Sequence, residues 1–436
     1  MPGDDWSWRH LSVFVSRLDA GVSVNSDDWP RHSGEVGVLK TSALSGGTFR
    51  PDQNKTVWAK ERRRVAISVE GDSIIVSRMN TPDLVGESAY VADDWPDLFL
   101  PDRLWLLRVR DRNAVCVRWL SHVLSSPQAR AYLKLHATGT SGSMKNLSKA
   151  RLLELPVPSP PVDQQRCIAT VLDALDEAIR KSEDIIAKIR QIRQGLLHDL
   201  LTGGIDESGE VRRPARIAPH LYKDSPLGRV PLEWAVKPVR SVSLGDGRYG
   251  SGAAAREYDP SLPRYVRITD MTDDGRLNDA TRASICTANA VPYMLSDGDL
   301  LFARSGATVG KTYLYSSHDG PCAHAGYVIK YSIDPARAVP AYVFLWTQSS
   351  AYWQWIGRTL RQGAQPNINE REYGGHLMAM PPLVEQRRIV SAMAAVTRRL
   401  ETESRETGTL HMLKSGLTDD LLTGNVRVSV LREAGP

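Results

Sequence analysis

A long segment occurs twice in this chain at one constant spacing. The first copy runs from Pro160 to Gly203 and the second from Pro381 to Gly424, and the differences 381 − 160 and 424 − 203 both give 221. One shift without gaps therefore aligns the whole segment. A repeat of this length and fixed spacing predicts one rigid structural element that the chain uses twice.

Each copy is predicted to be a single long helix. Both copies open on Pro-Pro, which ends the preceding element, and both close on Leu-Leu-Thr-Gly, where glycine stops a helix. Asp163 and Glu385 place a carboxylate in the first turn, which the helix dipole favours. Forty helical residues span roughly 60 Å. The apolar residues follow a heptad spacing, and the predicted seam consists of Ile168, Leu172, Leu175, Ile179, Ile186, Ile189, Leu196 and Leu200, with Ile389, Met393, Val396, Leu400, Leu410, Leu417 and Leu421.

The two helices are expected to pack on each other as a coiled coil, because a helix of this length cannot bury an apolar seam alone. The alternative is two separate amphipathic helices on two globular cores. It does not account for the shared polar breaks at Ser182 and Glu403 and at Arg193 and Lys414. The second copy has no apolar residue at positions 403–408, so we expect the coil to be loosest there.

Each long helix follows a globular segment. Residues 1–155 and 207–378 contain short alternating runs separated by Gly, Pro, Asn and Asp, which is typical of strands joined by turns. The segment 204–231, rich in Gly, Pro and Arg, is expected to link the two halves. The predicted organisation is a first recognition domain (1–155), a first helical spacer (156–206), a second recognition domain (207–378) and a second helical spacer with a tail (379–436).

The two globular domains correspond although most of their residues differ. Each begins near a tryptophan and has a strand that ends in arginine, followed by Val-Gly and later by a Gly…Asn stretch. The matching features are Trp6 or Trp8 with Trp234, Arg78 with Arg304, Val85-Gly86 with Val309-Gly310, and 142–146 with 363–367. The predicted fold class is α+β, in which a tandem duplication places each of two α/β domains before a long helix. Because the domains diverged, we expect two similar heads that bind different targets.

Composition bounds the class of protein. The 436 residues are 42% hydrophobic and 24% charged, which is ordinary for a globular chain. No apolar run approaches the roughly 18 residues of a membrane span, and the N-terminus lacks a signal-peptide pattern. The four cysteines are scattered without CxxC spacing, which argues against a zinc site or a disulfide framework. A cytoplasmic chain is therefore expected. The net charge of +5 points only weakly to nucleic acid.

The order and duplication of these motifs resemble the specificity subunit of type I restriction–modification systems. The matching stretches cover nearly the whole chain. They include GVLKTSAL (37–44), SRMNTPDLVGESAYV (77–91), ATGTSGSMKNLS (137–148), LLHDLLTG (196–203), GDLLFARSGATVGKTYLY (298–315), GAQPNIN (363–369) and PPLVEQRRI (381–389). The sequence departs from the family in the polar middle of the second helix and at Arg398-Arg399, where the first copy has Glu177-Ala178.

The resemblance implies a role for each part. Each globular domain would read one half of a split, asymmetric DNA target, and the two helices would form an antiparallel coiled coil that fixes the spacing. Two modification (methyltransferase) subunits would assemble on it, and restriction (translocase/nuclease) subunits would join that core. The resemblance places S-adenosylmethionine on the modification subunits and ATP with Mg²⁺ on the restriction subunits. It assigns no cofactor, metal or catalytic residue to this chain, which would be a non-catalytic bacterial or archaeal subunit.

One segment mimics a phosphate-binding loop. Residues 305–312 read SGATVGKT, but the first position of GxxxxGK[ST] is Ser305 and a β-like TYLYSS follows instead of a helix. We expect a turn between strands that presents Arg304 and Lys311 to DNA. The chain also lacks an Asn/Asp-Pro-Pro-aromatic methyltransferase motif, and its ten histidines show no ligand spacing. Catalysis by this chain alone is therefore not expected.

Candidate DNA contacts are chosen by chemistry, because phosphates favour Arg, Lys, Ser and Thr, while base edges favour Arg, Asn and Gln. They are Lys40, Thr41, Ser42, Lys55, Arg78, Asn80 and Lys145 in the first half and Arg248, Tyr249, Arg267, Arg304, Ser305, Lys311 and Gln365 in the second. For each residue, a solvated or ion-paired surface side chain is the alternative. For the whole chain, the alternatives are a coiled-coil protein–protein adaptor without DNA specificity and an NTPase that uses 305–312.

Overall fold

The computed structural model describes residues 6–139, 144–360 and 366–426. The chain divides into two compact units. The first unit combines residues up to Glu183 with those from Arg405 onward, and the second is Asp184–Ser404. Each unit thus contains one globular head, the beginning of the long helix that follows that head, and the end of the other long helix. No helix among the described residues is long and apolar enough to cross a membrane.

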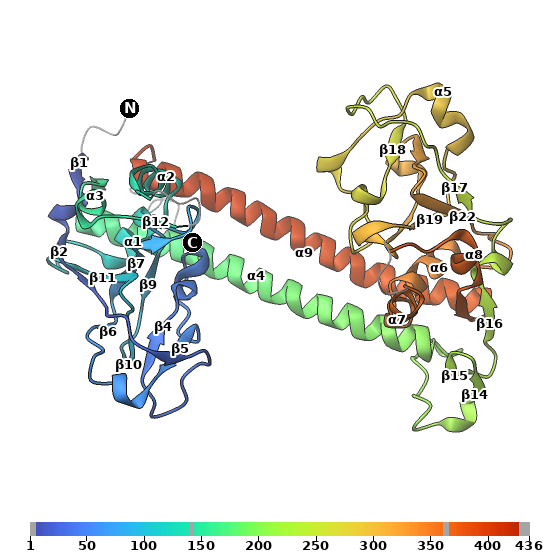
Figure 1. Ribbon diagram of the computed structural model, residues 1–436, viewed down its shortest axis with the longest axis horizontal. Helices are drawn as coiled ribbons and strands as arrows, with labels where there is room; N and C mark the ends of the chain where they lie inside the picture. Colours follow the sequence, from blue (N-terminus) through green and yellow to red (C-terminus); the bar gives the residue numbers. More distant parts are fainter. Residues whose placement is uncertain (1–5, 140–143, 361–365, 427–436) are drawn as a thin grey trace. The chain divides into compact units, whose positions relative to one another are not determined.

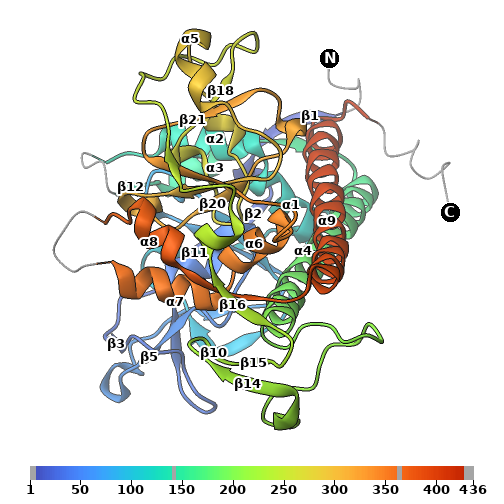
Figure 2. The same cartoon turned by 90° about the vertical axis from the view of Figure 1, so that its right-hand side faces the viewer.

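The two predicted long helices are present with closely matching bounds. Helix α4 spans Val162–Thr202 and helix α9 spans Leu383–Thr423, each 41 residues long (Figure 1). Within each unit, the segments of α4 and α9 lie side by side and antiparallel, as the second view also shows (Figure 2). In the first unit, Lys414 of α9 pairs with Asp176 of α4, and His411 Nε2 lies 3.3 Å from Glu183 Oε1. The prediction that the two copies pack on each other is confirmed.

Every residue of the predicted seam is buried or half-buried. The ends of the seam complete the cores of the heads. Ile168, Leu172 and Leu421 belong to the core of the first unit, while Leu200, Ile389 and Met393 belong to that of the second. Helix α9 continues without a break through 403–408, where Glu403 and Thr407 take buried positions and Glu403 bonds to Arg399. That this stretch is the loosest part of the coil stays a prediction.

The first head is built on two mainly antiparallel sheets. The four-stranded sheet has the order β2-β11-β7-β9, and the five-stranded sheet has the order β3-β5-β4-β10-β6. The helices α1 (Val117–Ser125) and α2 (Pro127–His136) pack their buried faces into the same core as β7 and β11. The strands are β2 (Val15–Ala20), β3 (Ser26–Asp27), β4 (Gly37–Leu39), β5 (Asn54–Val57), β6 (Ser68–Val69), β7 (Ser73–Ser77), β9 (Ser88–Val91), β10 (Trp95–Phe99) and β11 (Leu104–Val109).

The second head repeats the plan with fewer strands. Its four-stranded sheet has the order β17-β22-β19-β20, and β18 pairs in parallel with β21. Helices α6, α7 and α8 pack on the core that holds Phe302 and Tyr331. The elements of the second head, with the short helix α5 added, are α5 (Thr287–Ala290), α6 (Pro340–Thr347), α7 (Ser350–Thr359), α8 (Glu370–Gly375), β17 (Arg248–Tyr249), β18 (Arg264–Val266), β19 (Asp299–Ala303), β20 (Thr312–Leu314), β21 (Cys322–His324) and β22 (Val328–Ser332).

The predicted duplication is visible in the backbone where each head joins its helix. Strand β1 (Ser7–His10) pairs with β13 (Pro156–Ser159), and β16 (Ala235–Pro238) pairs with β23 (Leu377–Met380) in the same antiparallel way. The short helix α3 (Lys149–Leu153) precedes β13. Strands β13 and β23 are related by the same constant shift as the long helices, so the repeat includes the strand before each helix.

A buried glutamine fastens each helix to its own head. Gln165 Oε1 accepts a hydrogen bond of 2.9 Å from the amide of Cys116, which precedes α1, and Gln165 Nε2 donates to Pro160 O at 2.9 Å. Gln386 repeats both bonds, with the amide of Val339 at 2.8 Å and with Pro381 O at 2.8 Å. These two side chains are 2% and 1% exposed, so each hydrogen-bond set forms inside the protein, where a lost partner is costly.

A tryptophan also contacts the first turn of each helix. Trp6 Nε1 donates to Gln164 Oε1 at 2.9 Å in the first unit, and Trp234 Nε1 donates to Glu385 Oε2 at 3.2 Å in the second. Trp6, rather than the half-exposed Trp8, is therefore the counterpart of Trp234.

The prediction that 204–231 is a linker is wrong. Strands β14 (Tyr222–Ser225) and β15 (Gly228–Pro231) form a hairpin in this segment. Arg212 forms an ion pair with Glu385 at the start of α9, and the amide of Ile205 donates to the same carboxylate at 2.9 Å. The glycines and prolines therefore serve turns in a packed segment of the second unit.

Candidate nucleic-acid interface

The arginine that ends a central strand has the same backbone setting in both heads. Arg78 follows β7 directly and Arg304 follows β19 directly. Arg78 O accepts the amide of Leu147 at 2.8 Å, and Arg304 O accepts the amide of Ile368 at 2.9 Å. Leu147 lies shortly before the first long helix in the chain, and Ile368 lies shortly before the second. The correspondence predicted from the sequence is therefore confirmed at the level of individual hydrogen bonds.

The glycine of each Val-Gly pair closes the turn after this strand. Gly86 donates to Ser77 O at 2.7 Å and Gly310 donates to Ala303 O at 3.0 Å. Both glycines have positive φ, 72° and 91°, a conformation that other residues adopt only with strain. The carbonyl of the residue after each glycine accepts a hydrogen bond from the amide of the last strand residue. That residue is Glu87 in the first head but Lys311 in the second. The two turns thus share a backbone and carry opposite charges.

Arg304 is held from two sides. Its guanidinium carbon lies 4.7 Å from the centre of the Tyr249 ring, a cation–π contact, and its Nε donates to Asn367 Oδ1 at 3.2 Å. Tyr249 is itself fixed, because its hydroxyl accepts the amide of Glu370 at 3.2 Å. Within the described residues no carboxylate pairs with Arg304, and its two terminal nitrogens have no hydrogen-bond partner. Arg248, the neighbour of Tyr249 in β17, is exposed.

Arg78 occupies the equivalent place with looser support. Its guanidinium carbon lies 5.7 Å from the centre of the buried Trp105 ring, and Nη1 is 3.5 Å from Asp102 O. Strand β8 (Met79–Asn80) pairs with β12 (Lys145–Asn146), which places Asn80 opposite Lys145. The structure therefore brings three of the predicted contacts of the first head, Arg78, Asn80 and Lys145, to one edge. Lys145 Nζ donates to Gly139 O at 3.1 Å.

The other candidates of the first head form a separate group. Lys40 and Lys55 lie 3.3 Å and 3.0 Å from the same oxygen of Asp28. The hydrogen bonds from Lys55 and Lys40 hold the pKa of the Asp28 carboxyl below its usual value. Ser42 Oγ donates to Gln53 at 3.2 Å, and Thr41 opens the turn that follows Lys40. The charge of Asp28 therefore offsets part of the attraction that either lysine would exert on a phosphate.

The remaining candidates of the second head are engaged within the protein. Lys311 Nζ lies 2.9 Å from Asp273, and Arg267 bonds to the fully buried Asp270 and to Thr281 O. The hydrogen bond that Arg267 donates to Asp270 raises the pKa of Arg267. Ser305 is 8% exposed and its backbone bridges to Asn367. Gln365 lies outside the described residues.

Residues 305–312 do not form a phosphate-binding loop. A 3₁₀ turn at Gly306–Thr308 is followed by strand β20, whereas a phosphate loop requires a helix whose amides point at the phosphates. Lys311 points to Asp273 and to the Met271 carbonyl at 3.3 Å. The predicted turn between strands is confirmed.

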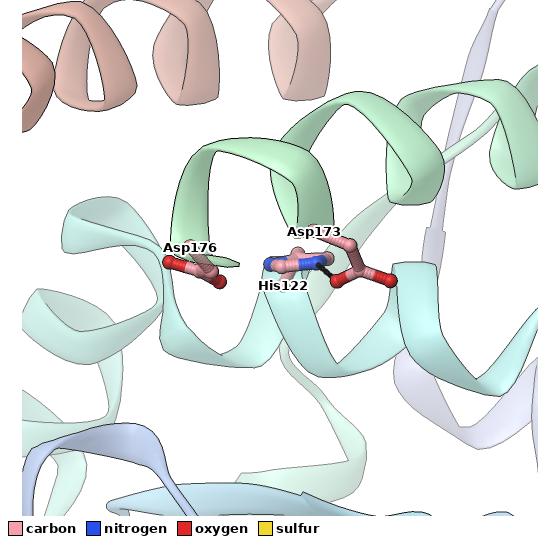
Figure 3. A group of neighbouring side chains, drawn as sticks. All are labelled: His122, Asp173 and Asp176. Carbon is pink, nitrogen blue, oxygen red and sulfur yellow. Dashed lines mark hydrogen bonds and ion pairs between the residues drawn. The ribbon is translucent and has the colours of Figure 1, made fainter. Parts of the chain in front are cut away.

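A polar network that the sequence did not reveal fastens the first head to α4. His122 of α1 lies 2.8 Å from Asp173 Oδ1, and Asp176 stands one turn further along α4 (Figure 3). Arg118 donates to Asp173 at 2.5 Å, and Lys414 of α9 pairs with Asp176. The network borders a cavity of about 1110 Å³ in the first unit, which also includes Arg50 and Glu87. His122 and Asp173 are 51 residues apart, so no local spacing could have revealed the pair.

The charges in this network are matched. Burial opposes ionisation of Asp173, but the hydrogen bond from His122 and the charge of Arg118 outweigh it and lower the pKa of that carboxyl. The ligand atoms of His122, Asp173 and Asp176 lie within 4.8 Å of one another, close enough to surround a metal ion. Arg118 and Lys414 already supply the positive charge that a metal would bring. A docking contact between α1 and α4 accounts for the arrangement.

The second head reaches its own helix through a different pair. Arg276 Nη2 donates to Glu401 Oε1 of α9 at 2.8 Å, and Asp274 also contacts Arg276 at 3.2 Å. Both heads are thus attached to their own helices at the first turns and again further along.

Comparison with known proteins shows which proteins this chain is similar to. Residues 29–191 match the family described as the type I restriction modification DNA specificity domain. The putative type I restriction enzyme MjaX specificity subunit of Methanocaldococcus jannaschii is 20% identical over 455 residues, which cover 98% of this chain and 94% of that protein. The EcoEI specificity subunit of Escherichia coli is 24% identical over 200 residues, which cover 45% of this chain but only a third (33%) of that protein.

Solved structures share the fold. The S subunit of the type I restriction–modification system from M. genitalium superposes with a TM-score of 0.61 at 14% identity, covering 96% of this chain and 97% of that one. A chain from a study of complex assembly and conformational transition in the type I system gives 0.54 at 14% identity, covering 98% and 100%. These similarities do not favour a protein–protein adaptor without DNA specificity. With its duplicated heads and helices, the chain is similar over nearly its whole length to the specificity subunits of type I restriction–modification systems, and its residues 29–191 match the DNA specificity domain of that family.

Proposed function

We propose that this chain recognises a bipartite, asymmetric DNA target, one half-site for each head. The observation that carries the proposal is the strand-end arginine, which recurs on the same backbone frame in both heads. Arg78 and Arg304 lack a carboxylate partner among the described residues, whereas Lys40, Lys55, Arg267 and Lys311 have one. An unpaired arginine offers two parallel donors to a phosphate or to a guanine edge.

The two half-sites are expected to differ. The turn beside the arginine carries Glu87 in one head and Lys311 in the other, and the stacked aromatic residue is Trp105 in one and Tyr249 in the other. Glu87 Oε1 accepts the amide of Gly46 at 2.9 Å and Lys311 pairs with Asp273, so these two side chains shape the surroundings of each arginine from within the protein. Heads with these different side chains would read different bases, so the target would not be palindromic.

The long helices would set the distance between the half-sites. Each helix has 41 residues, which corresponds to roughly 60 Å. Because α4 and α9 pack on each other within both units, their length is the quantity that would fix how far apart the heads bind.

The chemistry would belong to partner subunits. We propose that two modification (methyltransferase) subunits assemble on the repeated helices and that restriction (translocase/nuclease) subunits join them. S-adenosylmethionine would serve the former, and ATP with Mg²⁺ the latter. Two copies of one partner are supported by the repeat itself, because Ile192 and Leu413, which occupy the same position in the two copies, are apolar side chains exposed by 53% and 48%. Equivalent exposed apolar residues suit two equivalent contacts.

Footprinting and methylation mapping test the proposal. The chain, purified with its methyltransferase partner, should protect one split sequence, and methylated adenines mapped in the host genome should fall in that same sequence. Protection that ignores sequence would contradict the proposal. DNA affinity should also fall steeply as salt rises, because phosphate contacts release counterions.

A further inference from the structure

Asn367 and its counterpart Asn146 bear on how the strand-end arginines act. The sequence suggested only a structural joint before each long helix at these positions. In the second head, Asn367 Oδ1 accepts a hydrogen bond from Arg304 Nε at 3.2 Å. In the first head, Arg78 Nε and Asn146 Oδ1 are both buried and have no hydrogen-bond partner among the described residues. In the second head the arginine Nε therefore donates to the asparagine Oδ1, whereas in the first head the two corresponding atoms have no partner among the described residues.

The geometry at Arg304 leaves one part of the side chain available. Nε is taken by Asn367, and the face of the guanidinium lies on the Tyr249 ring. Only the two terminal nitrogens remain, and they form a planar fork with fixed spacing. Asn367 is exposed and Arg304 is half-buried, so the fork lies at the surface. A fork that is already oriented loses less conformational freedom on binding than a mobile arginine does.

The backbone keeps Asn367 beside Arg304. The residues that flank Asn367 both bond to this strand end, because Ile368 N donates to Arg304 O at 2.9 Å and Gly306 N donates to Pro366 O at 3.0 Å. Asn367 is therefore fixed in register with the arginine, in the way that Asn146 is fixed opposite Met79. An asparagine held in this way can orient a neighbouring side chain without touching the ligand itself.

We propose that Asn367 is a positioning residue, which holds Arg304 by Nε so that its two terminal nitrogens grip two adjacent acceptor atoms of the DNA. This inference rests on the proposed DNA-recognition function. The acceptors are either two phosphate oxygens or O6 and N7 of one guanine, since both pairs match the fork. Asn146 and Arg78 occupy the equivalent places in the first head, where Asn146 lies opposite Met79 and Leu147 N donates to Arg78 O. The two half-sites thus share one contact of the same kind at equivalent places.

A double-mutant cycle in the complete complex with methyltransferase subunits tests the proposal. Arg304→Ala should weaken binding to the natural target about 10- to 100-fold, the range of one bidentate contact. Asn367→Ala should weaken it less, and the double variant should bind no more weakly than Arg304→Ala alone. If the two losses multiply instead, Asn367 acts independently of Arg304 and the proposal is overturned. Asn367→Ala should also have no effect in an Arg304→Lys background, because lysine has no Nε–H donor to position.

Asn369 is the matched control. It lies in the same loop, but its Oδ1 accepts the amide of Glu372 at 3.0 Å and caps α8. Asn369→Ala should lower thermal stability while its effect on binding multiplies with that of Arg304→Ala. If it gave the same non-additivity as Asn367→Ala, the coupling would reflect loop structure and not positioning.

Modified DNA distinguishes the two kinds of acceptor. A methylphosphonate at one phosphate, or 7-deazaguanine at one guanine, should make Arg304→Ala harmless if that group is the acceptor. If no single modification does so, the fork does not grip DNA and the inference fails. In that case wild-type sequence-specific binding would still support the proposed function, whereas loss of specificity in the wild type overturns both.

Discussion

The two heads keep the same backbone arrangement where each joins its long helix, but they differ in the charges placed there. In the first unit the helix begins with neutral Gln164 under Trp6, while in the second unit the same position is Glu385 under Trp234. The second unit balances this buried carboxylate with Arg212, which the hairpin segment supplies. The first turn of each helix is otherwise bonded alike through Gln165 and Gln386. The hydrogen bonds of Gln165 and Gln386 are thus the same in both units. The charged residue Glu385 occurs in one unit only, and there it is accompanied by its partner Arg212.

The strongest way to break the comparison is to change the helices that the two heads share. Deleting two heptads in register from both α4 and α9 should shorten the preferred spacing between half-sites by roughly 20 Å of helix, at 1.5 Å per residue. Each head should keep its own half-site, because the head cores are not altered if the deletions lie in the middle of the helices. Selection of bound DNA from a library with variable spacers measures the result. An unchanged spacer would falsify the ruler role of the helices.

The buried carboxylate is the next largest difference. Arg212→Ala leaves Glu385, which is 6% exposed, without its cation, and such loss costs about 3–5 kcal/mol of unfolding free energy. Adding Glu385→Gln should recover most of that loss, because the first unit uses glutamine at this position without an arginine. The converse change, Gln164→Glu, should destabilise the first unit. Urea unfolding of the three variants is the measurement, and a double variant as unstable as Arg212→Ala would contradict the account.

The shared glutamines should behave alike. Gln165→Leu and Gln386→Leu each leave a buried backbone amide without its acceptor, which costs about 1–3 kcal/mol. Thermal melting should show a similar decrease for both variants, since the two side chains make the same pair of hydrogen bonds at nearly equal distances. Gln164→Leu is a suitable control, because it keeps both amide bonds and loses only the bond from Trp6. A large effect in one head and none in the other would show that the joint is not equivalent.

Lowering the pH should produce the smallest difference in stability between the two units. The pKa of Asp173 is lowered in the folded protein, so its carboxylate stabilises the first unit at pH values above the usual pKa of about 3.9. That contribution is lost as the pH falls through the lowered value. It amounts to less than about 1 kcal/mol because Asp173 is 40% exposed. Asp173→Asn should therefore destabilise the protein slightly at pH 7 and by a smaller amount at pH 3. Urea unfolding at both pH values checks this, and an equal loss at both would contradict it.

Local repetition made much of the fold predictable from the sequence. The proline and glycine signals at 160 and 203 lie next to the observed ends of α4, and the seam residues are buried or half-buried as expected. The matching strand-end arginines and Val-Gly turns are also confirmed. These features depend on residues close together in the chain or on the constant shift between the copies.

Long-range pairing explains what the sequence did not predict. The hairpin Tyr222–Pro231 was hidden because its glycine and prolines are equally typical of a linker. The contact of His122 with Asp173 joins two helices at no characteristic spacing. The role of Asn367 depends on the approach of Arg304, 63 residues away. Among the candidate DNA contacts, the sequence could not separate the unpaired arginines from residues such as Lys311, whose partner Asp273 lies on another turn.

The division of each unit between distant parts of the chain has a consequence during synthesis. The core of the first unit includes Ile168 and Leu172, but also Leu421 and Leu422 near the end of α9. A ribosome delivers the first pair long before the second, with the whole second head in between. The head that emerges first is therefore completed last, after the second head has already been made. Until then the part of its core that Leu421 and Leu422 cover stays open to solvent, and a product truncated before α9 lacks this cover.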